Sequence, residues 1–343
     1  MNKHLIAIVK FLLFFSLGFT ILYLLYKSQN EAYLEECAFK GIPESECVLL
    51  DKIIADFKSI KLIWVFVIVA LFTLSNYLRA IRWQALLKVM GYSTKTFNAF
   101  GTVMLGYFAN LGFPRLGEIV RPATLSKYEN IPLEKNIGTI IVERLVDVVC
   151  LLICIGLAIL LGGKTMVNYL QENSAITATQ IFFLLGLGIF GGLAAIIIYR
   201  QLLKQNSTNK VFLFIKEKLT GIIDGLMTLL KLEHKVTYII QTIGIWICYY
   251  LMTYLFFFAY APTEHLGPVA GLVTFVFGSL GIVIPSPGGM GSYHFLISQA
   301  LILYGVNSFE AFTFANILFF AIVIFCNILL GLLSLILLPI LNK

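Results

Sequence analysis

Long apolar runs separated by short polar segments limit the fold of this chain more than any other feature. A helix needs about 20 apolar residues to cross the hydrocarbon core of a bilayer. About six such runs occur, at 5–26, 62–78, 137–161, 177–199, 236–260 and 309–338. Hydrophobic residues make up 59% of the 343 positions and charged residues 13%, which leaves no room for a separate soluble domain. The sequence therefore predicts an all-α, polytopic integral membrane protein with a single transmembrane domain over residues 1–343.

The distribution of charge predicts how the helices are oriented. Acidic residues outnumber lysines at 27–61, as expected of an extracytoplasmic loop after a first helix that starts inside. The segment 200–235 is basic and is expected in the cytoplasm, with an interfacial or packed helix at 211–232. A further cytoplasmic cluster is expected where the second run ends, at Arg79, Arg82, Lys88 and Lys95. Both termini are thus predicted on the cytoplasmic side of the cell membrane.

Two cysteines, Cys37 and Cys47, lie ten residues apart in the acidic loop. They would form a disulfide if the loop faces an oxidising compartment. Two loop cysteines can equally stay free, so the sequence leaves both alternatives open.

Two shorter apolar stretches are interrupted by glycine and proline. The first, 97–113, runs into Pro114, and we interpret it as re-entrant because a full crossing would place the basic segment 200–235 outside. The second, 268–284, is followed by Pro285, Pro287, Gly288, Gly289 and Gly291. In transporters, such interrupted segments enter from opposite faces and expose backbone groups to substrate. The alternative is that glycine and proline merely kink two ordinary spans.

Three charged residues, Glu143, Arg144 and Asp147, lie deep inside the run 137–161. Each costs about 2.5–3.5 kcal/mol there unless it has a partner or a wet cavity. Glu143 and Asp147 share a helix face, whereas Arg144 points about 100° away. The expected partners are the charged residues of the first interrupted segment: Arg115, Glu118 and Arg121. Such a cluster would bind a phosphate through its arginines, or would be a salt-bridge network that holds the segment in place.

The second interruption opens a helix whose N-terminus would attract an anion, and its glycines allow a headgroup to approach closely. His294 in this helix is either a proton-responsive ligand or a structural residue. The sequence contains no protease, hydrolase or metal-binding motif and no nucleic-acid motif. We therefore expect no enzyme activity, catalytic residue, metal, cofactor or nucleic-acid partner.

Three ordered motifs carry a family resemblance. Residues 110–121 read NLGFPRLGEIVR, residues 143–147 read ERLVD, and residues 287–291 read PGGMG. In this order, and with Arg82-Trp83 at the end of the second run, they resemble the lysylphosphatidylglycerol synthase membrane-region family over nearly the whole chain. The family includes stand-alone flippase-like proteins and relatives linked to archaeal glycosylation of lipid carriers.

The resemblance implies a domain that translocates phospholipids between leaflets. The synthases add a soluble aminoacyl-transferase domain after this region, but this chain stops at Lys343, so we expect no aminoacyl transfer. Family members often carry an acid three residues after the last motif glycine, where this chain has His294. That difference puts in doubt a mechanism that needs a carboxylate at the second interruption.

The sequence thus predicts a lipid flippase or transporter for an anionic phospholipid or a lipid-linked phosphate. Arg115, Arg121 and Arg144 would hold the headgroup, while Glu118, Glu143 and Asp147 would balance or relay charge. The expected partners are membrane lipids. Two alternatives remain, a membrane-embedded transferase acting on a polyprenyl-phosphate carrier and a scaffold that assists a partner enzyme of lipid or glycan synthesis.

Overall fold

The computed structural model describes residues 47–113, 115–173, 227–284 and 289–342, together with isolated positions between 23 and 43. Secondary structure within these ranges is helical, as predicted. Four of the described helices are long and apolar enough to span a membrane, at Leu62–Val89, Leu133–Gly163, Lys235–Ala259 and Ser308–Leu341. They confirm four of the predicted spans and a polytopic membrane fold. The predicted span at 177–199, nearly all of the one at 5–26, and most of segment 200–235 lie outside the described residues.

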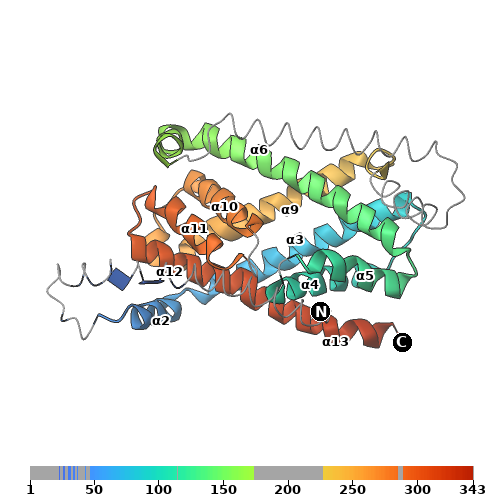
Figure 1. Cartoon of the computed structure of the whole chain (residues 1–343), viewed down its shortest axis with the longest axis horizontal. Helices are drawn as coiled ribbons and strands as arrows, with labels where there is room; N and C mark the ends of the chain where they lie inside the picture. Colours follow the sequence, from blue (N-terminus) through green and yellow to red (C-terminus); the bar gives the residue numbers. More distant parts are fainter. Residues whose placement is uncertain are drawn as a thin grey trace, which may run out of the picture.

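The spans form an elongated bundle (Figure 1). Helix α3 (Leu62–Val89) packs along α9 (Lys235–Phe256), and α6 (Leu133–Asn173) crosses over both. The last span consists of α12 (Ser308–Phe319), a π-helical segment (Phe320–Cys326) and α13 (Asn327–Leu341). We call the end where α3 and α13 finish and α6 begins the basic end, because Lys88 and Lys127 are exposed there.

The first interrupted segment is a helical hairpin, hairpin 1, formed by α4 (Thr96–Gly112) and α5 (Gly117–Glu129). It starts and finishes at the basic end, so the prediction of a re-entrant element is confirmed (Figure 1). The two helices meet so closely that a Cβ atom on Gly117 would overlap the carbonyl oxygen of Gly106. Asn110 accepts a hydrogen bond from the Gly117 amide at 2.7 Å, which satisfies a backbone donor in the first turn of α5.

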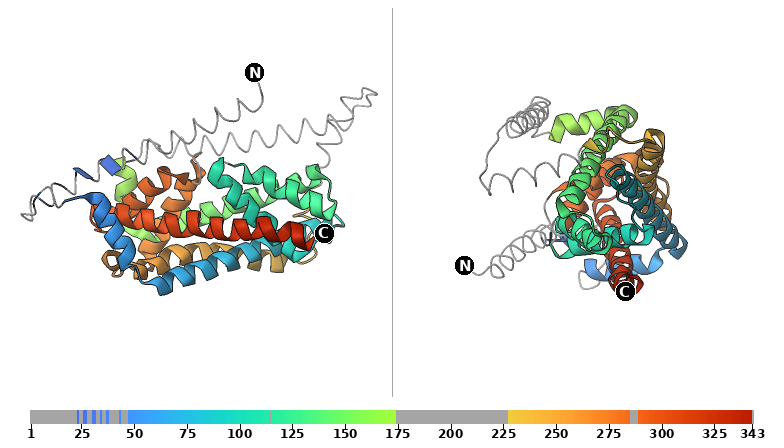
Figure 2. Two further views of the ribbon diagram at one scale, coloured as in Figure 1. Left: turned by 90° about the horizontal axis from the view of Figure 1, so that it is seen from below. Right: turned by 90° about the vertical axis from the view of Figure 1, so that its right-hand side faces the viewer.

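The second interrupted segment is hairpin 2, formed by α10 (Pro268–Val283) and α11 (Ser292–Ile302). It enters from the end opposite to hairpin 1 (Figures 1 and 2). Gly291 has a φ of 84°, a conformation that glycine adopts without strain. The Ser292 hydroxyl donates to the Gly281 carbonyl at 2.7 Å and ties the two helices together. The expected residues Pro287 and Gly288 lie outside the described residues.

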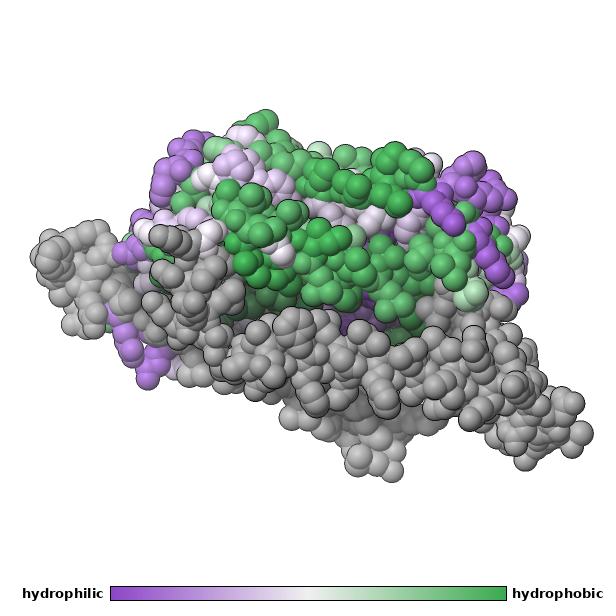
Figure 3. Space-filling model, turned by 90° about the horizontal axis from the view of Figure 1, so that it is seen from above, coloured by the Kyte–Doolittle hydropathy of each residue, from purple (hydrophilic) through white to green (hydrophobic). Residues whose placement is uncertain are grey.

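Helix α6 joins the two hairpins, because it packs against α5 near one end and α10 near the other. Ala158 is fully buried in a cluster with Val273 and Phe277 of α10. On its other side α6 exposes large apolar residues, among them Leu145 and Val148. Figure 3 shows that apolar surface covers the middle of the visible face, while polar residues gather at both ends. Such a belt suits lipid rather than water.

The expected extracytoplasmic loop 27–61 contains an amphipathic helix, α2 (Leu49–Ser59), at the end opposite the basic end. Cys37 and Cys47 form a disulfide, with 6.4 Å between their Cα atoms, which decides between the two alternatives for this pair. Asp56 of α2 is buried and accepts a hydrogen bond from the Tyr260 hydroxyl at 3.0 Å. This contact helps to dock α2 onto the segment between α9 and α10.

Candidate functional site

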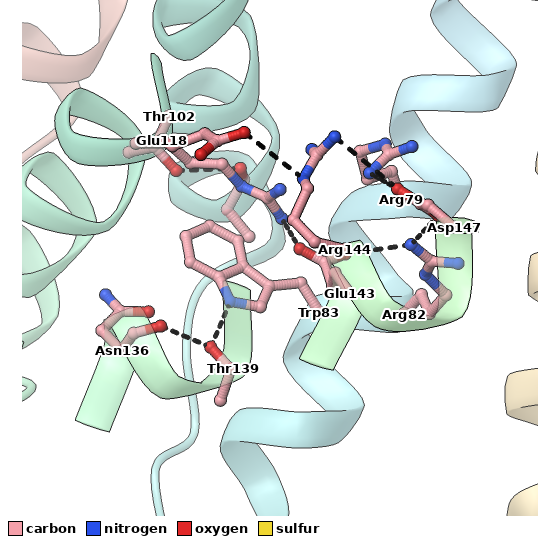
Figure 4. Close-up of polar contacts among 12 residues, drawn as sticks. Arg79, Arg82, Trp83, Thr102, Glu118, Asn136, Thr139, Glu143, Arg144 and Asp147 are labelled. Atoms are coloured by element: carbon pink, nitrogen blue, oxygen red, sulfur yellow. Dashed lines mark hydrogen bonds and ion pairs between the residues drawn. The ribbon is translucent and has the colours of Figure 1, made fainter. Parts of the chain in front are cut away.

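Charged side chains from α3, α5 and α6 meet inside the bundle (Figure 4). The seven residues are Arg79, Arg82, Glu118, Arg121, Glu143, Arg144 and Asp147, and we call them the charged cluster. Five of the seven are among the six charged residues that the sequence predicts for this site. The five come from hairpin 1 and from α6, and the structure brings them together as expected.

Two arginines of α3 face the two acids of α6. Arg79 contacts Asp147 at 3.0 Å, and Arg82 contacts Asp147 at 3.1 Å and Glu143 at 3.4 Å. Arg79 and Arg82 are one helical turn apart, as are Glu143 and Asp147, so the pairs align when the helices cross. Arg82 and Glu143 are fully buried. A charge pair taken out of water in this way persists only with close counter-ions.

The placement of Arg79 and Arg82 corrects the sequence-based prediction that they belong to a cytoplasmic positive cluster. Helix α3 does not end near residue 78 but continues to Val89, and both arginines are buried. The positive-inside rule places arginines near the end of an apolar run at the membrane surface. It could not reveal their counter-ions, which are on another helix and more than 60 residues away. One sequence feature could have indicated the pairing: the two arginines are one helical turn apart, and so are the two acids.

Arg121 of α5 occupies a second buried position. Its guanidinium lies 2.7 Å from Glu143 and stacks over the ring of Trp83, with 3.9 Å between the guanidinium carbon and the ring centroid. The Trp83 indole donates to the Thr139 hydroxyl at 2.8 Å, which fixes the ring in place (Figure 4). An arginine held by a carboxylate and an aromatic face keeps its planar donor fork in one orientation.

Arg144 differs from the other three arginines because it is accessible. Its side chain is 45% exposed, and that of Glu118 is 43% exposed. Its nitrogen atoms lie 4.0 Å from Glu118 and 3.8 Å from Asp147, which is too far for a hydrogen bond. The flanking residue Leu145 is exposed on the apolar face of α6. Arg144 therefore places a loosely held cation at the edge of the cluster.

A chain of hydroxyl groups extends the cluster toward α9 and α4. Arg79 donates to the Tyr249 hydroxyl at 3.0 Å, and the hydroxyl groups of Tyr249 and Tyr107 are 3.5 Å apart. Arg82 donates to the Thr242 hydroxyl at 3.2 Å. Sequence reasoning missed these neutral partners, because a tyrosine or threonine in an apolar helix gives no sign of what it contacts.

The cluster carries more positive than negative charge. Four arginines face three carboxylates, so its formal net charge is +1. The Nε atoms of Arg79, Arg82 and Arg121 are buried and have no hydrogen-bond partner in the described part of the chain. Arginine stays protonated and matches phosphate oxygens with its forked donors. The arrangement therefore suits an anion better than a cation.

Arg115 and His294 are expected site residues that are not part of the charged cluster, and neither are Gly289 and Gly291 at the turn of hairpin 2. Arg115 is exposed at the turn of hairpin 1 with a φ of 62°, and it makes no ion pair with any residue that the structure describes. His294 is buried: its Nδ1 accepts a hydrogen bond from the Gly291 amide at 3.3 Å, and its ring lies 4.5 Å from that of Phe319. These contacts suit a structural role for His294. Across the described ranges, no group of three His, Cys, Asp or Glu residues could hold a metal.

Comparison with known proteins identifies the family. The chain is 35% identical over 101 residues to a UPF0104 membrane protein of Methanocaldococcus jannaschii, which covers 29% of this chain and 30% of that protein. It is 31% identical over 113 residues to the glycosyltransferase AglD of Haloferax volcanii, covering 32% and 18%. The alignments thus span less than a third of either relative. No solved structure matches the chain. The family model described as lysylphosphatidylglycerol synthase TM region matches residues 47–331, and the chain therefore belongs to that family.

Proposed function

We propose that this protein moves a lipid with an anionic, phosphate-bearing headgroup between the leaflets of the cell membrane. The observation that carries the proposal is Arg144, an accessible cation in the middle of a lipid-facing helix, backed by buried arginines. We further propose that the basic end faces the cytoplasm, in agreement with its exposed lysines.

The energetic obstacle to lipid transfer is the passage of a charged headgroup through hydrocarbon. A cluster with a net charge of +1 lowers this cost by offering forked hydrogen bonds to phosphate. Phosphate oxygens reach Arg144 first, because Arg79, Arg82 and Arg121 are buried. The acyl chains remain in the bilayer along the exposed apolar residues of α6.

Hairpin 1 is the element that would open and close this path. Its Glu118 contacts Arg144 over 4.0 Å, whereas its Arg121 is held by Glu143 at 2.7 Å. A phosphate that binds Arg144 replaces Glu118 as its counter-ion and loosens the outer contact between α5 and α6. The buried pair of Arg121 and Glu143 keeps the hairpin attached during this exchange. In transporters with paired interrupted helices, one part of the protein likewise moves or gates against another around a fixed central site.

A transport assay tests the proposal. Full-length protein is reconstituted into vesicles that contain fluorescent phosphatidylglycerol, and a membrane-impermeant reductant measures how fast the probe changes leaflet. Arg144→Gln should slow this transfer at least about tenfold, because a charge-assisted hydrogen bond contributes about 1.5–3 kcal/mol. Lys88→Gln, which removes an exposed cation at the basic end outside the cluster, is the matched control and should leave the rate unchanged.

Equal rates for wild type and Arg144→Gln, with both well above protein-free vesicles, would exclude Arg144 as the headgroup contact. Rates for wild type that equal those of protein-free vesicles, for fluorescent phosphatidylglycerol and a fluorescent polyprenyl phosphate alike, would exclude transport of either lipid class.

A second candidate function is assistance to, or catalysis of, sugar transfer onto a lipid-linked phosphate. The similarity to a relative named as a glycosyltransferase favours it, although the match covers 18% of that relative. The same charged cluster would then hold the phosphate of the lipid carrier. Incubation of the protein with a polyprenyl phosphate and a labelled sugar nucleotide separates the functions: labelled lipid without leaflet transfer supports the transferase, and the reverse supports transport.

A further inference from the structure

A groove separate from the charged cluster lies between hairpin 1 and the last helix. Its volume is about 360 Å³, which is within the range of roughly 300–1,000 Å³ typical of ligand sites. Leu105 of α4 lines it, together with residues of α5 and α13 such as Thr124, Lys127, Leu335 and Pro339. The groove is near the basic end, where α5 and α13 both finish.

Contacts at the basic end hold the three walls of the groove together. The Asn98 amide of α4 donates to Glu129, the last residue of α5, at 2.6 Å. Asn98 also exchanges two hydrogen bonds, of 2.9 Å and 2.7 Å, with Asn342 just after α13. Farther along, a Cβ atom on Gly331 of α13 would overlap the side chain of Phe108 of α4. The helices are therefore fixed to each other on both sides of the groove.

The lining of the groove matches the two parts of a lipid. Leu105 and Leu335 provide apolar surface for an acyl chain. Lys127 is exposed, and no acidic side chain of the described ranges forms an ion pair with it. Thr124 adds a hydroxyl group. Pro339 adds to the apolar part of the lining.

We propose that this groove binds one acidic glycerophospholipid from the leaflet at the basic end. The lipid phosphate lies at Lys127 and Thr124, and one acyl chain lies along the leucines of the groove. The apolar lining within a membrane-spanning bundle selects a lipid rather than a soluble phosphate compound. The proposal goes beyond the proposed function, since the groove lies on α5 toward α13, whereas Arg121 on the same helix faces Glu143 of α6.

Native mass spectrometry of the purified full-length protein measures this binding without any transport step. Phosphatidylglycerol should bind more tightly than phosphatidylcholine with the same acyl chains. Lys127→Gln should weaken phosphatidylglycerol binding about fivefold, which corresponds to the loss of about 1 kcal/mol for one lysine at an anionic lipid. Lys88→Gln, at an exposed lysine of the same end outside the groove, is the matched control and should have no effect.

A variant that fills the groove tests the acyl-chain part. Ala123→Phe should weaken binding of both lipids, and Leu335→Phe, at a side chain that is 52% exposed, replaces it if Ala123→Phe does not fold. Equal affinities of wild type for the two lipids, or equal effects of Lys127→Gln and Lys88→Gln, would overturn the proposal. So would displacement of the lipid by glycerol 3-phosphate at the same concentration.

Discussion

Asp147 pairs with three arginines, more than any other acid that the structure describes. Its carboxylate lies 3.0 Å from Arg79, 3.1 Å from Arg82 and 3.8 Å from Arg144, and only 13% of its side chain is exposed. Glu143 is fully buried and shares Arg82 and Arg121. The two acids of α6 therefore each serve at least two arginines, whereas Glu118 of α5 faces Arg144 alone among the described residues.

Removal of Asp147 should be severely destabilising. Asp147→Ala leaves Arg79 buried without its carboxylate, and the loss of one partner from a buried pair costs about 3–5 kcal/mol. Titration of the purified protein with a denaturing detergent measures the change in the free energy of unfolding. Glu118→Ala is the matched control, because its half-exposed pair with Arg144 contributes about 0–1 kcal/mol. If both variants lost a similar amount of unfolding free energy, the buried ion pairs of Asp147 would contribute no more to stability than the exposed pair of Glu118.

The sequence predicts part of this site. Glu143 and Asp147 are identifiable because charges four residues apart in a long apolar run share one face and need partners. Arg79 and Arg82 escaped detection because the same two arginines, near the end of an apolar run, equally fit a membrane surface. Which helix faces which is a property of tertiary packing, and no pattern within α3 alone contains it.

At the scale of elements, the two hairpins could be predicted and the ends of the spans could not. Glycine and proline between apolar stretches indicate a reversal, and hairpin 1 and hairpin 2 both occur at such places. Helix α2 within the polar segment 27–61 was not predicted. Its apolar residues are too few for a span, and they pack against the bundle instead, as in the contact between Phe57 and Phe320.

Close backbone contact within hairpin 1 should make Gly117 intolerant of a side chain. Gly117→Ala places a Cβ atom against the carbonyl oxygen of Gly106 and should cost about 1–3 kcal/mol through overpacking. The matched control is Gly112→Ala in the same hairpin, where a Cβ atom meets nothing within 4 Å. Thermal unfolding in detergent should separate the two variants. If Gly117→Ala were as stable as Gly112→Ala, the backbones of α4 and α5 would not be in close contact at Gly106 and Gly117.

At the scale of the whole molecule, the position of the basic end relative to the cell is a prediction. Lys88→Cys and Asp51→Cys introduce exposed thiols at the basic end and in α2, at opposite ends of the bundle. In intact cells a membrane-impermeant maleimide should label Asp51→Cys and spare Lys88→Cys, and cell lysis should make both reactive. The unsubstituted protein is the control for its native cysteines. If Lys88→Cys alone were labelled before lysis, the basic end would face outward, opposite to the prediction.

Helix α6 contacts α5 with one half and α10 with the other, and Glu143 lies within the contact with α5. Glu143 and Asp147 also bind Arg82 of α3, so one helix is bonded at a single place to a long span and to hairpin 1. A tilt of α6 about that place would move its contact with hairpin 2 as well, so neither hairpin could shift far without a change at the other.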